Sequence, residues 1–449
     1  MPLRAASYAA SLVQRAAAHP VARAAAGFAG ITGLVKAVAF LKEAVVAAAF
    51  GVGPAMDSYL MALVIITFPS AVLLNAAQTV FIREYVRAIT LRGEAAAARF
   101  LRGSMFTVLL ALTLTLALWV AVLPAILSIV GHGLAPPQRA LVAANVVKLI
   151  PYYYLTGINL LGYGILQARQ MFLRSALFPI ATPLVVMGLV AMFSADLDVL
   201  IGALTAGTAA ETVFIFVTGR AHFASTAEGP AEATSLVRDF ATGSLTLVPG
   251  TLIAGLSPVI EQTIASGLGS GAIAGLGYAA KLPATLNTLL TTAIGVTILP
   301  YFSDRLSRGD VQSCRSFFVR YTGLIVLAGL AIAAVAALGS APFVRLAFEH
   351  GHFTARDTLF VTAIQQAYLW QLPGAMVSTL ALRYVVAQGR YRALTLGTMA
   401  MLPFSAFLQW WLARGWGAPG LAFGTSAGVT LTALVFFRLA LRNSSEGAP

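Results

Sequence analysis

Long apolar stretches recur along this chain and constrain its fold more than any other feature. Of the 449 residues, 59% are hydrophobic and 10% are charged, and the mean hydropathy is +0.85. About twenty apolar residues in a helix, at ~1.5 Å per residue, cross the ~30 Å hydrocarbon core of a bilayer. The sequence therefore predicts an all-α polytopic membrane protein with about twelve transmembrane helices. The expected spans are 27–50, 57–82, 103–130, 140–166, 175–194, 199–219, 244–267, 273–301, 321–340, 358–386, 393–413 and 419–440.

The basic residues are distributed unevenly between alternate loops of these spans. With a cytoplasmic N-terminus, 20 basic residues fall on the cytoplasmic side and four on the outer side. Cytoplasmic loops carry an excess of Lys and Arg, so both termini are predicted to be cytoplasmic. The net charge of +13 is therefore attributed to topology and not to nucleic-acid binding. Residues 1–26 hold three arginines and no acid, and are expected to form a basic amphipathic segment on the inner leaflet, with a targeting peptide as the alternative.

Short motifs that recur about 218 residues apart indicate an internal repeat. Phe50-Gly-Val-Gly53 matches Leu268-Gly-Ser-Gly271, and Glu43 has a counterpart in Glu261 at the same offset. Six spans in each half give the two halves the same orientation, so the sequence predicts two six-helix lobes related by a parallel repeat. The expected parts are the N-terminal segment 1–26, an N-lobe 27–220, a cytoplasmic linker 221–243, a C-lobe 244–442 and a tail 443–449.

Ionisable residues lie inside the first expected span, where each costs ~2.5–3.5 kcal/mol at the centre of a lipid-facing helix. Lys36 and Glu43 are seven residues apart and share a helix face, and Lys42 lies about a third of a turn away. Snorkelling toward the span end is an alternative for Lys42 and Glu43, whereas Lys36 lies deeper. These charges predict a polar, water-accessible cavity within a helix bundle.

Three regions of the sequence carry a resemblance to a known family. They are Lys36–Gly53 with Asp57 and Phe81–Tyr85, then Gly277–Pro283 with Gly295–Pro300, and finally Phe348–Thr354. Together they resemble the MviN/MurJ-type flippases of lipid-linked oligosaccharides, which belong to the multidrug/oligosaccharidyl-lipid/polysaccharide exporter superfamily. The resemblance extends over about 27–440.

The resemblance implies that cations of the first and eighth spans, and an acid opening the second, line a central cavity and bind the diphosphate of the cargo. By position these residues are Lys36, Lys42, Asp57 and Lys281. The family pattern has arginine at the three basic positions, so here compact ammonium groups replace planar guanidinium forks. The basic pair of the family's second span is absent near Ser70.

The function that the resemblance implies is that of a flippase, not an enzyme, in the bacterial cytoplasmic membrane. It would translocate a polyprenyl-diphosphate-linked glycan by alternating access, the glycan being a peptidoglycan precursor or an exopolysaccharide or O-antigen-type repeat unit. Moving the anionic head group through hydrocarbon is prohibitive, and a cationic cavity offers it charge-assisted hydrogen bonds. The expected partners are this lipid, the bilayer and glycan-assembly enzymes. Catalytic residues, metal sites, cofactors and nucleic acid are not expected, and the energy would come from the membrane potential or an ion gradient.

Two functions other than that of a flippase are also compatible with the sequence. An ion-coupled exporter of small molecules or drugs has the same helical plan, although a surplus of lysines disfavours a cationic cargo. A non-transporting membrane scaffold for glycan assembly would tolerate Lys36→Ala and Lys281→Ala.

Several individual residues also allow more than one interpretation. Asp57 is expected either to line the cavity or to cap the second helix, since acids suit a helix N-terminus. Glu43 and Glu261 are expected either to form salt bridges with lysines or to bind a coupling cation. Lys148 is expected to snorkel or to form part of a site, and Arg383 is expected to be structural.

Overall fold

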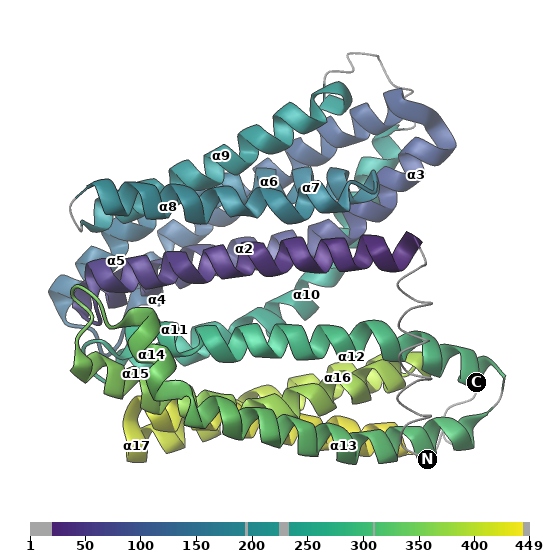
Figure 1. The fold of residues 1–449 in the computed structure, drawn as a ribbon. Coiled ribbons are helices and arrows are strands. Elements are labelled where there is room, and N and C mark those ends of the chain that lie inside the picture. The colour runs from purple at the N-terminus through teal and green to yellow at the C-terminus, as the bar shows by residue number, and fades with distance from the viewer. Residues whose placement is uncertain (1–19, 194–195, 224–232, 309, 443–449) are drawn as a thin grey trace. The chain divides into compact units, whose positions relative to one another are not determined.

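The computed structural model describes residues 20–193, 196–223, 233–308 and 310–442, and within these ranges the chain forms helices and no strand. Most of the expected N-terminal segment and the tail 443–449 lie outside the described residues. The elements are α2 (Pro20–Phe50), α3 (Pro54–Ala121), α4 (Leu123–Val130), α5 (Pro136–Lys148), α6 (Ile150–Ala168), α7 (Phe172–Leu177), η1 (Phe178–Ile180), α8 (Ala181–Met192), α9 (Leu197–Phe223), α10 (Ala233–Ser266), α11 (Ala272–Ala279), α12 (Lys281–Ser307), α13 (Val311–Leu338), α14 (Ser340–Phe348), α15 (Ala355–Leu369), α16 (Gln371–Ala387) and α17 (Tyr391–Leu441) (Figure 1).

Six of the described helices are long and apolar enough to cross a membrane, and α5 with α6 makes a seventh if this bent pair is one span. The six are the helical stretches Pro54–Ala121, Phe172–Met192, Leu197–Arg220, Ser235–Ser266, Val311–Leu338 and Arg392–Leu441. The predicted all-α polytopic membrane fold is thereby confirmed. The expected number of twelve spans stays a prediction.

Two of these helices are much longer than a bilayer is thick, and each is interrupted at a glycine. The 68 residues of α3 would extend ~100 Å as one straight helix. Gly93 interrupts α3 with φ 79° and ψ −177°, and Gly417 interrupts α17 with φ 63° and ψ −142°. Positive φ is readily adopted by glycine. The two breaks lie between the expected spans 57–82 and 103–130, and between 393–413 and 419–440.

The bent pair α5 and α6 corresponds to the single expected span 140–166. The two helices meet at an angle of 44°. Pro151 is the second residue of α6, where its missing N–H leaves no helical hydrogen bond unmade. The expected continuous span is therefore a broken one.

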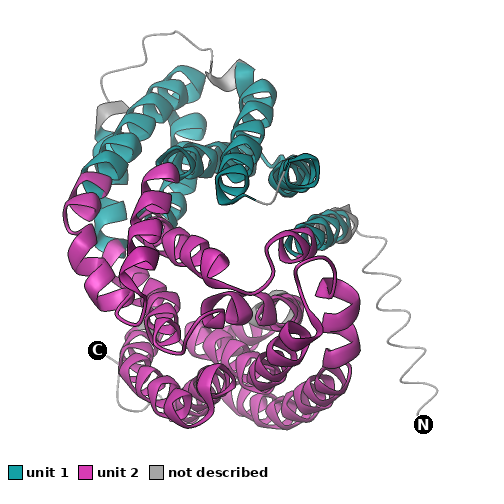
Figure 2. Ribbon diagram, turned by 90° about the vertical axis from the view of Figure 1, so that its left-hand side faces the viewer, with its two compact units in different colours: residues 1–43, 73–115, 150–247 teal, residues 44–72, 116–149, 248–449 magenta. Residues whose placement is uncertain are grey.

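The chain divides into two compact units (Figure 2). Unit 1 comprises 1–43, 73–115 and 150–247, and unit 2 comprises 44–72, 116–149 and 248–449. The boundaries cut through α2, α3 and α10, so each of these helices contributes to both units. The expected lobes 27–220 and 244–442 stay a prediction, and α10 begins at Ala233, within the expected linker.

Aromatic side chains from distant parts of the chain pack together in unit 1. Phe81, Phe100 and Phe240 are buried, with ring centroids 5.6 Å apart for Phe81–Phe100 and 6.0 Å apart for Phe100–Phe240. Gly164 of α6 lies so close to Phe81 that a Cβ would stand 2.8 Å from the ring. The glycine thus lets α6 approach this aromatic cluster closely.

At the end of α6 in unit 1, Arg169 joins the turn of α3 around Gly93. The Arg169 guanidinium donates two hydrogen bonds to the Glu94 carboxylate, one of them with Nη1–Oε1 at 2.6 Å. It also lies 5.7 Å from the ring centroid of Tyr85. The hydrogen bonds to Glu94 raise the pKa of Arg169 above its usual range. This bidentate pair fixes the turn of α3 to the end of α6.

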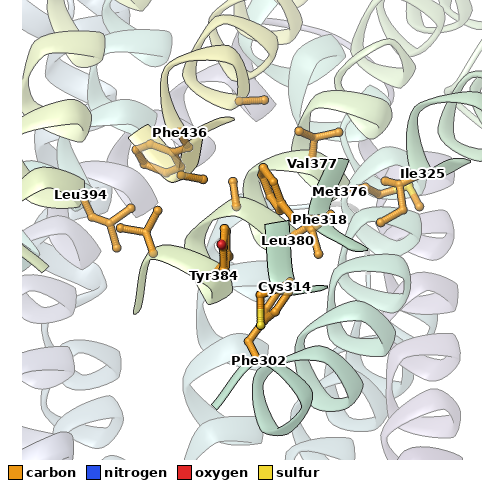
Figure 3. Close-up of a cluster of buried hydrophobic side chains, with 14 residues drawn as sticks. Phe302, Cys314, Phe318, Ile325, Met376, Val377, Leu380, Tyr384, Leu394 and Phe436 are labelled. Atoms are coloured by element: carbon orange, nitrogen blue, oxygen red, sulfur yellow. The ribbon is translucent and has the colours of Figure 1, made fainter. Parts of the chain in front are cut away.

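The core of unit 2 lies where α12, α13, α16 and α17 pack against one another (Figure 3). Leu380 and Phe318 are fully buried, and the Tyr384 ring lies 4.7 Å from Phe302 and 5.0 Å from Phe318 between centroids. Near this core, a Cβ on Gly374 of α16 would stand 2.8 Å from the Cα of Thr430 in α17. Helix packing in membranes relies on such close approach, because lipid supplies no hydrophobic driving force between helices.

We predict that Gly374→Ala lowers the thermal stability of the purified protein in detergent. The new methyl group would meet backbone atoms that cannot rotate away, which costs about 1–3 kcal/mol. Gly202→Ala in α9 is the matched control, because no atom lies within 4 Å of its Cβ position. Equal melting temperatures for the two variants would contradict this account of the α16–α17 contact.

Candidate functional site

The charges of the first expected span lie on α2, within the part that belongs to unit 1. The Lys36 side chain is exposed, and within the described residues it takes part in no hydrogen bond or ion pair. The Lys42 ammonium lies 2.6 Å from Glu43 Oε1, and both side chains are about one-fifth exposed. Glu43 thus forms a salt bridge with the neighbouring lysine, and Lys36 keeps its charge available for another group.

Asp57 lies in unit 2, in the first turn of α3, and is 1% exposed. Its Oδ2 accepts a hydrogen bond from the Gly271 N–H at 2.5 Å, and its Oδ1 accepts one from the Ala274 N–H at 2.7 Å. These are N-terminal donors of α11, which have no acceptor within their own helix. The expectation that Asp57 caps its own helix is therefore wrong, because both carboxylate oxygens accept hydrogen bonds from the N-terminus of α11.

The segments around Gly51 and Gly351 contact each other in unit 2. His352 N–H donates to the Ala48 carbonyl at 2.8 Å, and Gly351, with φ 58°, leaves room for that approach. Gly51 has φ 62°, and a Cβ there would stand 2.6 Å from the His352 carbonyl oxygen. The segments 48–57, 271–274 and 348–354 thus form one packed joint. Their glycines are explained by this packing.

Lys281 and Glu261 also lie in unit 2 but on different helices. Lys281 is half-buried and is the first residue of α12, directly after α11. Glu261 of α10 is half-buried and accepts a hydrogen bond from the Tyr368 hydroxyl of α15. Glu43 and Glu261, equivalent in the sequence repeat, therefore have different partners.

A cavity of about 340 Å³ in unit 2 surrounds Arg383, which the sequence interpretation assigned a structural role. The guanidinium Nε and the Ser378 hydroxyl are buried, and neither has a hydrogen-bond partner within the described residues. Hydroxyl groups and an aromatic ring share the lining, which includes Thr291, Thr292, Ser378, Thr379 and Phe436. A cation among hydroxyls is a suitable environment for an anionic group.

Glu84 and Glu211 of unit 1 are buried acids that were not predicted from the sequence as site residues. Glu84 is 1% exposed and forms ion pairs with Arg83 at 2.7 Å and Arg87 at 3.4 Å. Glu211, in the apolar stretch Leu197–Arg220, is 9% exposed. A single acid inside an otherwise apolar stretch is itself a signal that the sequence provides for Glu211. In the described part of the chain, no three His, Cys, Asp or Glu side chains gather closely enough to hold a metal ion.

The long apolar helices with interior charges define a polytopic membrane protein, and comparison with solved structures places its fold among transporters. The fold matches a structure described as "Lipid II flippase MurJ, inward closed conformation" with a TM-score of 0.76, 17% identity, and coverage of 92% of this chain and 87% of that one. An inward-facing multidrug resistance MATE family transporter of the MOP superfamily matches with a TM-score of 0.73, 12% identity, and coverage of 93% and 97%.

The family follows from the sequence. The model of the family described as "Lipid II flippase MurJ" matches residues 46–447, so the chain belongs to this family, as the resemblance predicted. Among its relatives, a probable lipid II flippase MurJ of Rhizobium meliloti (strain 1021) is 23% identical over 74% of this chain, and one of Rhizobium tropici is 26% identical over 74%. The matches span 64% of the length of both relatives.

We predict that Asp57→Ala destabilises unit 2 whether or not a cargo lipid is present. Removal of the carboxylate leaves two buried N–H groups of α11 without an acceptor, and each unsatisfied group costs about 1–3 kcal/mol. Thermal denaturation in detergent, with and without added lipid II, measures the effect. Asp239→Asn, at a half-exposed acid, is the control. A variant as stable as wild type, with a defect only in lipid binding, would contradict the capping role.

Proposed function

We propose that this protein translocates a polyprenyl-diphosphate-linked glycan across the cytoplasmic membrane. The observation that carries the proposal is the match of the lipid II flippase family over residues 46–447. The relatives' names point first to lipid II, a peptidoglycan precursor, as the cargo. An exopolysaccharide or O-antigen-type repeat unit shares the diphosphate and the lipid tail, and is the alternative cargo.

The charges inside the helices support an anionic head group as cargo. Lys36 of unit 1 is exposed on α2, and Lys281 of unit 2 lies where α11 meets α12. Each ammonium offers three donors to diphosphate oxygens in place of water. We propose that Lys36, Lys42 and Lys281 contact the head group during transport. Asp57 is left out of this binding group because both of its oxygens accept backbone hydrogen bonds.

Both termini are proposed to be cytoplasmic, since this orientation places most of the arginines inside. Transport is proposed to draw on the membrane potential or an ion gradient. Enzymes that build the glycan are proposed as neighbours, because they make the lipid that the flippase consumes.

We predict that Lys36→Ala and Lys281→Ala each reduce translocation of lipid II at least tenfold, because loss of one charge-assisted contact of about 1.5–3 kcal/mol corresponds to a factor of ten or more. Lys36→Arg and Lys281→Arg should retain activity, because the charge is kept. Translocation is measured by the accessibility of lipid II to an added modifying enzyme in proteoliposomes. Lys148→Ala is the matched control, since Lys148 is an exposed lysine outside the proposed binding group.

Depletion of the protein in its own cells tests the cargo class directly. A flippase predicts that a polyprenyl-linked glycan accumulates on the inner leaflet, and the chemical analysis of that lipid identifies the glycan. Absence of any accumulating polyprenyl-linked lipid, together with full activity of both alanine variants, would overturn the proposed function.

A further inference from the structure

Glu211 is a carboxyl group deep inside an apolar helix of unit 1. It lies 14 residues after Leu197 and nine before Arg220, the ends of the apolar stretch of α9. At ~1.5 Å per residue these distances are ~21 Å and ~14 Å along the helix axis. An ionisable side chain at such a depth is expensive to retain and is by default a candidate functional site.

Two hydroxyl groups from neighbouring helices contact the Glu211 carboxyl. The Thr182 hydroxyl of α8 donates to Oε1 at 2.5 Å, and the Tyr163 hydroxyl of α6 donates to Oε2 at 2.9 Å. Within the described residues, Glu211 takes part in no ion pair. The three helices therefore bring together one acid and two neutral hydroxyls.

Close helix packing keeps this group in place. Gly207 lies one turn before Glu211 on α9, and a Cβ there would stand 2.7 Å from the Thr182 Cα. On the α6 side, Asn159 donates to the Thr208 carbonyl at 3.2 Å and accepts from the Thr212 hydroxyl at 2.7 Å. These contacts hold α6, α8 and α9 in register around the carboxyl, and they leave Asn159 engaged in helix packing.

Three elements that pack against α9, namely α6, α8 and η1, offer no positive charge to Glu211. α8 (Ala181–Met192) and η1 (Phe178–Ile180) contain no titratable residue. α6 (Ile150–Ala168) contributes tyrosines alone, namely Tyr152, Tyr153, Tyr154 and Tyr163. An ionised carboxylate without a cation is costly in such surroundings, whereas a protonated carboxyl is neutral and can still hydrogen-bond. Oxygen-bound metal ions need about six ligands, and the contacts of Glu211 supply two hydroxyls.

We propose that Glu211 is a proton-binding site of the transport cycle, with Thr182 and Tyr163 as the groups that hold the carboxyl in both protonation states. In the neutral state the proton is bound to a carboxyl oxygen. In the ionised state both oxygens accept hydrogen bonds from the two hydroxyls, and the released proton passes to water that reaches the site. The site binds protons irrespective of cargo; its coupling to translocation rests on the proposed function.

Infrared difference spectroscopy of the full-length protein in lipid tests the binding of the proton. Wild-type protein should show the carbonyl-stretch band of a protonated carboxyl, which disappears as the pH rises, and Glu211→Gln should lose this band. Thr182→Val and Tyr163→Phe each remove one donor that favours the ionised form. Each should therefore move the midpoint upward by about one to two pH units. Asp198→Asn, at an exposed acid in the first turn of α9, should leave the band unchanged.

Three outcomes of this titration would overturn the proposal. If Glu211→Gln retains the band while melting at the same temperature as wild type, the carboxyl is not the group observed and the proposal is overturned. If the midpoint instead moves with sodium concentration at constant ionic strength, the site binds sodium and the proposal is also overturned. If Glu211→Gln does not fold, Glu211→Asp replaces it, and an unchanged midpoint in that variant overturns the proposal.

A second measurement separates proton binding from coupling. In proteoliposomes, an imposed pH gradient should change the rate of lipid II translocation by wild-type protein, and the rate of Glu211→Gln should not respond to it. If wild-type protein moves no lipid II but the band still titrates, the proposed cargo fails and the proton site stands. If lipid II moves and both proteins respond equally to the gradient, Glu211 does not couple the proton and that part of the inference fails.

Discussion

A charged side chain inside a helical membrane protein is costly unless neighbouring groups stabilise its charge. This cost accounts for most of the contacts that the acids inside the helices make. The cost of an unpaired ion in a low-dielectric interior is several kcal/mol, on the order of a protein's whole stability. Asp57 meets it with backbone N–H groups of α11, and Glu84 with two arginines. Glu261 accepts a tyrosine hydroxyl, and Glu211 accepts two hydroxyls from neighbouring helices. Only the first two arrangements provide strong compensation for a full negative charge.

This difference separates acids with backbone or cationic partners from acids whose partners are neutral hydroxyls. A carboxylate at a helix N-terminus or between guanidinium groups accepts hydrogen bonds from backbone N–H groups or from cations, and these contacts join parts of the structure to one another. A carboxyl whose neighbours are neutral hydroxyls is hydrogen-bonded in either form. The same side-chain chemistry therefore serves the joint around Asp57 and the proposed proton site at Glu211, and the partners decide between the two roles.

The helical character, the class of the protein and its family were predictable from the sequence, because long apolar stretches and the motifs around Lys36 and Lys281 are local signals. The groups that individual side chains contact in the folded protein were not predictable in this way. Asp57 was expected to cap its own helix, but the helix that it caps lies more than two hundred residues away in the sequence. The importance of Glu211 depends on Thr182 and Tyr163, which are unremarkable residues in their own spans. The role of a Thr or Tyr hydroxyl can be assigned only when the packing of the helices shows which group it contacts.

Residues that the predicted sequence repeat places at equivalent positions have different partners in the structure. Repeat-equivalent residues should make equivalent contacts if they served only the shared scaffold. Glu43 instead pairs with Lys42, whereas Glu261 accepts a hydrogen bond from Tyr368. The sequence Gln167-Ala-Arg169 is similar to Gln388-Gly-Arg390, yet Arg169 binds the Glu94 carboxylate, whereas Arg390 donates to the Leu439 carbonyl at the end of α17. The predicted repeat therefore concerns the pattern of the sequence, whereas the contacts of these side chains differ between the two halves. Glu211 in the N-terminal half accepts hydrogen bonds from two hydroxyls, whereas Arg383 in the C-terminal half lines a cavity with hydroxyls, so similar polar surroundings hold opposite charges in the two halves.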